Sequence, residues 1–158
     1  MEVRDEKDPD RGLSDWLDLQ KLMSLEVNYW YEVDRNWGRC AHTYYVPGGK
    51  FVIGDKTLVG ADAIANFYKW REGRGERAAR HVVTNFRLSE GKELRARFEC
   101  ILMLYAADGR VPLPSESPVM IADITSECER RPNGRWLFRT HALAPIFTGS
   151  TPATLPPT

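Results

Sequence analysis

The chain has 158 residues, of which 42% are hydrophobic and 28% are charged, a composition typical of one soluble globular domain. No apolar stretch approaches the roughly 20 residues that a membrane-spanning helix needs, and the charged N-terminus lacks the apolar run of a secretion signal. Lys and Arg together number 22, as do Asp and Glu, so no net positive charge attracts nucleic acid. We therefore expect neither a membrane nor a nucleic-acid partner, and a cytoplasmic location.

The first predicted element is a long helix that runs from about residue 14 to residue 35. Residues 1–12 before it are polar and are expected to form a flexible arm. Ser14 is the expected N-cap of the helix. Apolar side chains then follow at helical spacing: Leu17, Leu19, Leu22, Met23, Trp30 and Val33. After Asp34 the sequence indicates a short turn, in which Trp37 is expected to reach the core.

A hairpin and a second helix are predicted next. Between residues 42 and 59, aromatic and β-branched residues surround the turn signals Pro47-Gly48-Gly49 and Gly54-Asp55, which indicates short strands joined by tight turns. The second helix opens at Gly60 and is ended by Gly73 and Gly75. Its predicted inward stripe consists of Ile64, Phe67 and Tyr68.

A basic tract covers the end of this helix and the residues after it. Between residues 69 and 80 the basic side chains outnumber the acidic ones, Glu72 and Glu76; they are Lys69, Arg71, Arg74, Arg77 and Arg80. One interpretation is a solvated helix end and loop. The other is a basic rim beside a pocket that favours an anionic ligand.

Four strand candidates complete the chain: residues 81–88, 94–105, 119–130 and 135–143, the last after the Pro132-Asn133-Gly134 turn. Because proline cannot continue a ladder, the last strand is expected to stop before Pro145. Residues 149–158 are then expected to be an extended, Pro-rich tail. Helices first and long antiparallel strands afterwards predict an α+β fold in a single domain, residues 13–148.

The three cysteines, Cys40, Cys100 and Cys128, are widely spaced and odd in number. This pattern fits neither a disulfide framework nor a zinc site. No other metal-ligand spacing and no glycine-rich phosphate loop occurs. We therefore expect free thiols, no metal and no cofactor.

His81 is the strongest candidate for acid–base chemistry, because imidazole changes charge near neutral pH. A carboxylate on one ring nitrogen would leave the other nitrogen free to act as a base. Alternation along the strand, however, places His81 with Val83, Asn85 and Arg87 on the more polar face. To turn His81 inward, the strand would need a bulge or strong curvature at its start.

The order of helix, hairpin, helix and four long strands resembles the cone-shaped fold of the nuclear-transport-factor-2-like superfamily, and in particular its SnoaL-like branch. In this fold N-terminal helices pack on a strongly curved, mostly antiparallel sheet. The resembling residues extend over almost the whole chain: Tyr29, Val33-Asp34-Arg35, Trp37, Gly60, Ala63-Ile64, Phe67, His81, Thr84-Asn85, Arg87-Leu88, Glu129-Arg130-Arg131, Gly134 and Trp136.

Within this branch the chain resembles hexachlorocyclohexane dehydrochlorinase, bile acid 7α-dehydratase and scytalone dehydratase. The resemblance implies a cofactor-independent lyase, dehydratase or isomerase that acts on a small hydrophobic, cyclic substrate. It implies that His81 and Asp34 form a catalytic pair and that Tyr29 is a third catalytic or substrate-facing group. It also implies a late-strand arginine, for which Arg139 and His141 on one strand face are the nearest candidates.

Several alternatives stay open. Tyr31 rivals Tyr29, since at about 100° per residue positions 31 and 34 lie within about 60° around a helix, whereas 29 and 34 diverge by about 140°. Tyr31 and Tyr45 are therefore kept, with Arg139 and His141, as candidate substrate-binding residues.

The function also has alternatives. The same fold builds the non-catalytic β subunits of ring-hydroxylating dioxygenases, and a related ligand-binding protein would place His81 far from Asp34. A polyketide-type cyclase or an epoxide hydrolase would use the same pocket with other polar residues. We expect a homo-oligomer, either a dimer or a trimer, that takes a small hydrophobic molecule. A dioxygenase-type small subunit would instead associate stably with a larger Rieske-type subunit.

Overall fold

The computed structural model describes residues 9–150; the outer parts of the expected arm and tail, residues 1–8 and 151–158, lie outside this range. The first half of the chain contains two helices and a hairpin: α1 (Pro9–Asn36), a short 3₁₀ helix η1 (Ala41–Tyr44), β1 (Tyr45–Ile53), β2 (Lys56–Val59) and α2 (Gly60–Glu72). Four longer strands follow: β3 (Arg77–Lys92), β4 (Arg95–Asp108), β5 (Met120–Arg130) and β6 (Trp136–Thr148).

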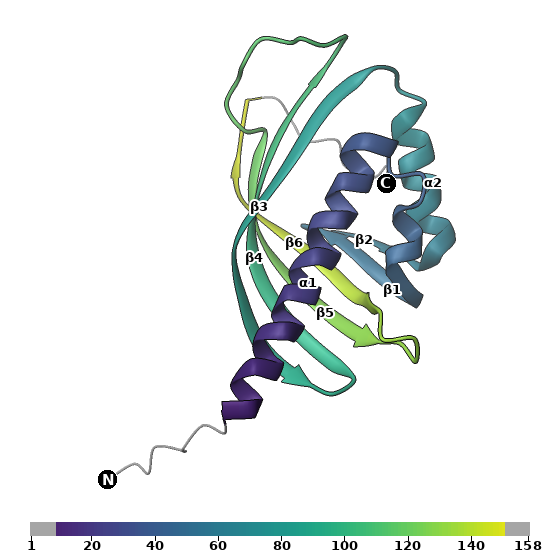
Figure 1. The fold of residues 1–158 in the computed structure, drawn as a ribbon. Helices are drawn as coiled ribbons and strands as arrows, with labels where there is room; N and C mark the ends of the chain where they lie inside the picture. Colours follow the sequence, from purple (N-terminus) through teal and green to yellow (C-terminus); the bar gives the residue numbers. More distant parts are fainter. Residues whose placement is uncertain (1–8, 151–158) are drawn as a thin grey trace.

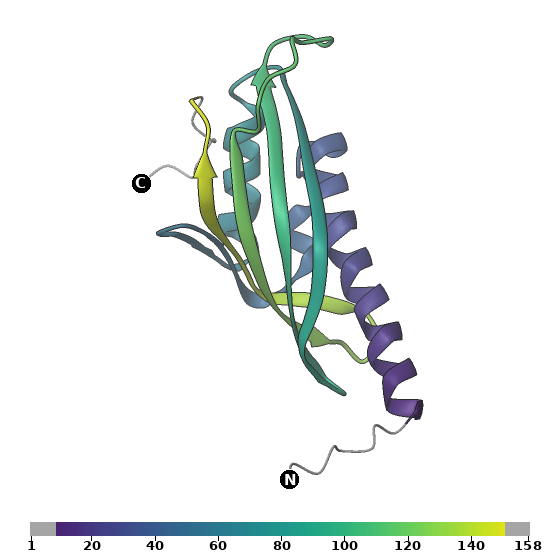
Figure 2. The ribbon, with the colours of Figure 1, turned by 90° about the vertical axis from the view of Figure 1, so that its left-hand side faces the viewer.

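The strands form one six-stranded sheet in the order β2-β1-β6-β5-β4-β3. Neighbouring strands are antiparallel, except that β1 runs parallel to β6. The long strands bend, and both helices lie on the same side of the sheet (Figures 1 and 2). The architecture is therefore the predicted α+β arrangement of helices on a curved, mostly antiparallel sheet.

The core lies between the helices and the inner face of the sheet. On α1 the buried positions recur every three or four residues, at Leu22, Leu25, Glu26, Tyr29 and Trp30, which directs one stripe of the helix toward the sheet. On β4 they alternate with period two, as a strand covered on one face requires: Ala96, Phe98, Cys100, Leu102 and Leu104. The three cysteines are free, as predicted.

Several predicted boundaries were wrong. The strand predicted at residues 81–88 runs from Arg77 to Lys92, the one predicted at residues 94–105 runs from Arg95 to Asp108, and two further errors involve proline. Helix α1 begins at Pro9 and not after Ser14, because proline lacks only a backbone N–H that the first helical turn does not use. Strand β6 continues through Pro145 to Thr148, where the sequence predicted that it would stop. Pro145 pairs with Ala122 beside a register shift, and such an irregularity tolerates the missing donor.

Strand β3 changes its inward face halfway along its length. Its register with β4 shifts between Thr84 and Arg87, and Asn85 has a left-handed backbone with φ of 57°. Before the shift the inward residues include His81 and Val83, whereas after it they are Phe86 and Leu88. The prediction of uninterrupted alternation was therefore wrong, and the irregularity lies in the middle of the strand.

Replacing Asn85 by Val should lower the free energy of unfolding by about 1–2 kcal/mol, because a β-branched residue is strained at positive φ. Asn85→Gly should cost less than Asn85→Val, since glycine adopts this conformation without steric strain. Urea-induced unfolding of both variants measures the difference. A valine variant as stable as the glycine variant would contradict the assigned backbone geometry.

Candidate active site

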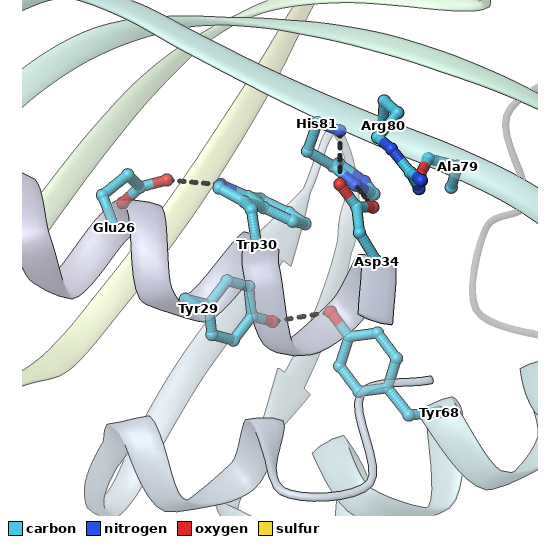
Figure 3. A network of polar contacts seen from close by, with 8 residues as sticks. All are labelled: Glu26, Tyr29, Trp30, Asp34, Tyr68, Ala79, Arg80 and His81. Atoms are coloured by element: carbon cyan, nitrogen blue, oxygen red, sulfur yellow. Dashed lines mark hydrogen bonds and ion pairs between the residues drawn. The ribbon is translucent and has the colours of Figure 1, made fainter. Parts of the chain in front are cut away.

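Asp34, in the last turn of α1, contacts His81 on β3 with both of its carboxylate oxygens (Figure 3). The His81 Nδ1 atom lies 2.6 Å from Asp34 Oδ1, and the backbone N–H of His81 donates to Oδ2 at 2.9 Å. The two side chains are only 10% and 8% exposed. Because the carboxylate engages Nδ1, the Nε2 atom is left without a hydrogen-bond partner in residues 9–150.

Trp30 fixes the plane of the His81 ring. The indole stacks on the imidazole with ring centroids 4.1 Å apart and an interplanar angle of 11°. Trp30 Nε1 in turn donates to Oε1 of the buried Glu26 at 2.6 Å (Figure 3). Because the indole is held both at its face and at its Nε1 atom, it fixes the orientation of the His81 ring.

One face of α1 positions all three of these groups. Glu26, Trp30 and Asp34 are spaced by four residues, and side chains at this spacing lie one above the other on a helix. Glu26 therefore holds Trp30, and Trp30 and Asp34 both hold His81. Trp30 was predicted only as an apolar residue of the helix, although its spacing of four residues from Asp34 was a signal for this arrangement.

The His81–Asp34 pair borders a cavity of about 180 Å³. Much of its lining is apolar, with aromatic and aliphatic side chains from both helices and several strands, among them Trp37, Phe51, Phe67, Leu104 and Leu143. An apolar cavity of about 150 Å³ can hold benzene. This site therefore suits a molecule with one small ring.

Tyr68 is a further polar group of the cavity wall, and it pairs with Tyr29. The two hydroxyl oxygens lie 2.6 Å apart (Figure 3). Burial, first of all, raises the pKa of both phenols well above the usual value of 10, and neighbouring tyrosines and then acidic side chains raise it further. Both phenols are consequently protonated at neutral pH, and if Tyr29 donates to Tyr68, then Tyr68 can donate to a ligand.

Gly38 allows the Tyr68 ring to lie where it does. A Cβ atom on Gly38 would stand 2.5 Å from a carbon of that ring, and the backbone there has a left-handed φ of 69°. Only glycine tolerates both the close approach and the conformation. The tight turn after α1 thus helps to place a phenol of α2 at the cavity.

The two tyrosine candidates of α1 do not border the cavity. Tyr29 is fully buried in the core and reaches the cavity only through Tyr68. Tyr31 is 64% exposed, and its ring contacts the guanidinium of Arg35 at 5.6 Å. The helical angle favoured Tyr31, but its side chain lies on the solvent-exposed side of α1.

His141 and Tyr45 form a second polar cluster inside the core. His141 Nε2 lies 2.9 Å from Glu26 Oε1, and Nδ1 lies 3.1 Å from the Tyr45 hydroxyl. Neither residue lines the cavity. Arg139 borders a different surface hollow, with Glu90 and Arg95. The structure therefore brings His141 to the site only indirectly, through Glu26 and Trp30, and leaves Arg139 away from it.

Two arginines of the basic tract do border the cavity, namely Arg71 and Arg77. Among residues 9–150 no group of three or more His, Cys, Asp or Glu side chains is arranged to hold a metal ion. No helix in the same part of the chain is long and apolar enough to span a membrane.

Neither a family model nor a curated protein matches the sequence. Solved structures do match its fold. An NTF2-like protein with a cystatin-like fold from Novosphingobium aromaticivorans is 15% identical, with a TM-score of 0.69, and the match covers 94% of this chain and 95% of that chain. A candidate scytalone dehydratase from the same organism is 13% identical, with a TM-score of 0.75 and coverage of 90% and 93%.

A protein from Catenulispora acidiphila in complex with S-DNPA is 14% identical, with a TM-score of 0.69 and coverage of 80% of this chain and 91% of that one. At such identities the likeness concerns the backbone and not the activity. The order of the elements, the curved sheet and these neighbours agree. The chain therefore has the nuclear-transport-factor-2-like, or cystatin-like, fold.

Proposed function

We propose that this protein is a cofactor-independent acid–base enzyme, a dehydratase-type lyase or an isomerase, acting on a small cyclic substrate. The observation that carries the proposal is the contact between His81 and Asp34 at the edge of a largely apolar cavity. It leaves Nε2 as the ring nitrogen available to a substrate. A non-catalytic ligand-binding module gives no reason for these side chains to meet, so the geometry supports the enzyme.

In the proposed reaction, His81 Nε2 removes a proton from a carbon next to a substrate carbonyl. The electrons of the C–H bond form an enolate, and Tyr68 donates a hydrogen bond to its oxygen. Asp34 stabilises the imidazolium. In an elimination, the enolate expels a β-hydroxyl group, which takes the proton from His81 and leaves as water. In an isomerisation, the proton returns to another carbon.

The descriptions of two fold neighbours support the chemical class of this proposal. One is described as a candidate scytalone dehydratase and another holds a small molecule, S-DNPA. The tyrosine pair supports the same class, because two phenols with raised pKa values are hydrogen-bond donors at neutral pH. A cyclase or an epoxide hydrolase has no comparable support among the described side chains.

Proton abstraction can be tested without knowing the natural substrate. Cyclohexanone, 3-hydroxycyclohexanone and 4-oxocyclohexanecarboxylate are incubated in D₂O, and NMR follows deuterium uptake beside the carbonyl and any loss of water. We expect the wild type to accelerate exchange on at least one probe, and His81→Ala to lower this rate by at least about 10²-fold. His42→Ala, at a histidine outside the cavity, is the matched control.

Equal exchange rates for the wild type and His81→Ala on all three ketones would contradict the proposal. Circular dichroism of the variants establishes that both histidine replacements leave the fold intact.

A further inference from the structure

Arg71 and Arg77 reach the border of the cavity from two different elements. Arg71 lies in the last turn of α2, three and four residues after Tyr68 and Phe67, which border the same cavity. Arg77 opens β3 and alternates with Ala79 and His81, so all three side chains lie on the inner face of the strand. Two guanidinium groups thus share one small cavity with the proposed base.

Asp108 is the acidic side chain whose charge acts on Arg71, whereas the carboxylates of Asp34 and Glu72 are engaged by other partners. The Asp34 carboxylate binds His81 through both oxygens, and Glu72 forms an ion pair with Arg39. Within residues 9–150, the Arg71 side chain has no hydrogen bond or ion pair of its own. Burial, and then the charge of Arg77, lowers the pKa of Arg71 to about 10.

Arg77 is more deeply buried than its acidic neighbour. Its side chain is 11% exposed, whereas that of Asp108, at 3.5 Å, is 73% exposed. Burial also lowers the pKa of Arg77. The lining of the cavity includes two guanidinium groups, Arg71 and Arg77, and one carboxylate, that of Asp34, in a chain with no net charge.

We propose that the cavity takes substrates with a carboxylate group, which Arg71 and Arg77 bind while the ring faces His81. A guanidinium matches a planar carboxylate with two parallel hydrogen bonds, and a desolvated site strengthens them. The inference names a substrate class for the proposed enzyme and rests on the same cavity. It makes the ligand a small cyclic acid and not a purely hydrophobic molecule.

Calorimetric titration with inert ring compounds tests the charge preference apart from catalysis. Benzoate and cyclohexanecarboxylate are compared with benzamide and cyclohexanecarboxamide, which have the same shape and no charge. We expect the wild type to bind the acids at least about 10-fold more tightly than the amides, the range of a charged hydrogen bond. Equal affinities for acid and amide would overturn the proposal.

Single replacements test whether Arg71 and Arg77 cause the preference for acids over amides. Arg71→Gln should weaken benzoate binding by about 10-fold and leave benzamide binding unchanged, and Arg77→Gln should behave alike. Arg74→Gln is the matched control, because Arg74 lies over the Trp70 ring at 5.2 Å and does not border the cavity. Its benzoate affinity should stay within about twofold of the wild type.

An Arg71→Gln protein that is folded by circular dichroism and keeps the full preference for benzoate would overturn the proposal. So would an equal loss in Arg74→Gln, since it would indicate a general charge effect. His81→Ala separates the two proposals: it should abolish deuterium exchange and keep the preference for acids. If the wild type prefers acids but exchanges no probe, the proposed reaction fails and the carboxylate site stands.

Discussion

Replacing Asp34 by Asn is expected to lower the rate of proton transfer by about 10²- to 10⁴-fold. Asp34 Oδ1 holds the proton on His81 Nδ1 and thereby leaves Nε2 as the free base. An asparagine side chain can instead donate its N–H to Nδ1, which moves the imidazole proton to Nε2 and blocks proton abstraction there. The carboxylate charge that stabilises the imidazolium is lost as well. Deuterium exchange from the ketone probes measures the effect.

A double replacement tests whether His81 and Asp34 act as a catalytic pair or contribute to the rate independently. If His81 and Asp34 act together, His81→Ala combined with Asp34→Asn should be no slower than the slower single variant. Asp123→Asn, at an exposed position of β5, is the matched control and should keep wild-type exchange. Effects that multiply in the double variant would contradict a joint role. Because Asp34 also accepts the backbone N–H of His81, thermal unfolding is measured in parallel.

The free energy of unfolding should fall steeply above about pH 10. Burial raises the pKa of Tyr29, Tyr45 and Tyr68 in the folded protein well above 10, whereas in the unfolded chain each ionises near pH 10. Above that pH the unfolded state has lost protons that the folded state retains, which favours unfolding. Each group contributes a slope of about 1.4 kcal/mol per pH unit, so the three together give about 4 kcal/mol per unit.

Buried thiols extend this effect to lower pH. Burial raises the pKa of Cys100 and Cys128 in the same way, and a thiol in the unfolded chain ionises near pH 8.5. The stability that these groups contribute is therefore complete below about pH 8, and its loss begins with the cysteines and accelerates with the tyrosines.

Urea-induced unfolding between about pH 8 and pH 11 measures the slope. Tyr45→Phe should reduce the slope above pH 10 by about 1.4 kcal/mol per unit, whatever it does to the stability at neutral pH. The matched control is Tyr31→Phe, which removes a hydroxyl group at a largely exposed tyrosine. A flat profile up to pH 11 would contradict the burial of the three phenols.

The fold could be predicted because its elements leave strong local signals. The turn Pro132-Asn133-Gly134 and the glycines around α2 mark boundaries, and apolar spacing separates the helices from the strands. Pro145 misled the prediction, because whether a strand tolerates proline depends on pairing with a neighbour, here Ala122 on β5. The pairing register between distant strands cannot be predicted from the local sequence.

The candidate site was predictable only in part. His81 and Asp34 were named through a resemblance, and the structure places them in contact. Local alternation placed His81 on the polar face of the strand. The bulge at Asn85 changes which face of β3 points inward, and it results from pairing with β4, which the local sequence does not reveal. Tyr68 was assigned to the inward stripe of α2. It is buried and also lines the cavity, and its sequence spacing is the same as that of a residue that only packs in the core.

The stack of Trp30 on His81 gives the protein an internal optical reporter. Indole emission responds to the charge of an imidazole in van der Waals contact, and here the two rings are nearly parallel at 4.1 Å. Glu26 holds the indole from its other end, so the ring has little freedom to leave the imidazole. We therefore expect the emission of Trp30, one of 5 tryptophans in the chain, to change with the charge of the proposed base, without substrate or an added label.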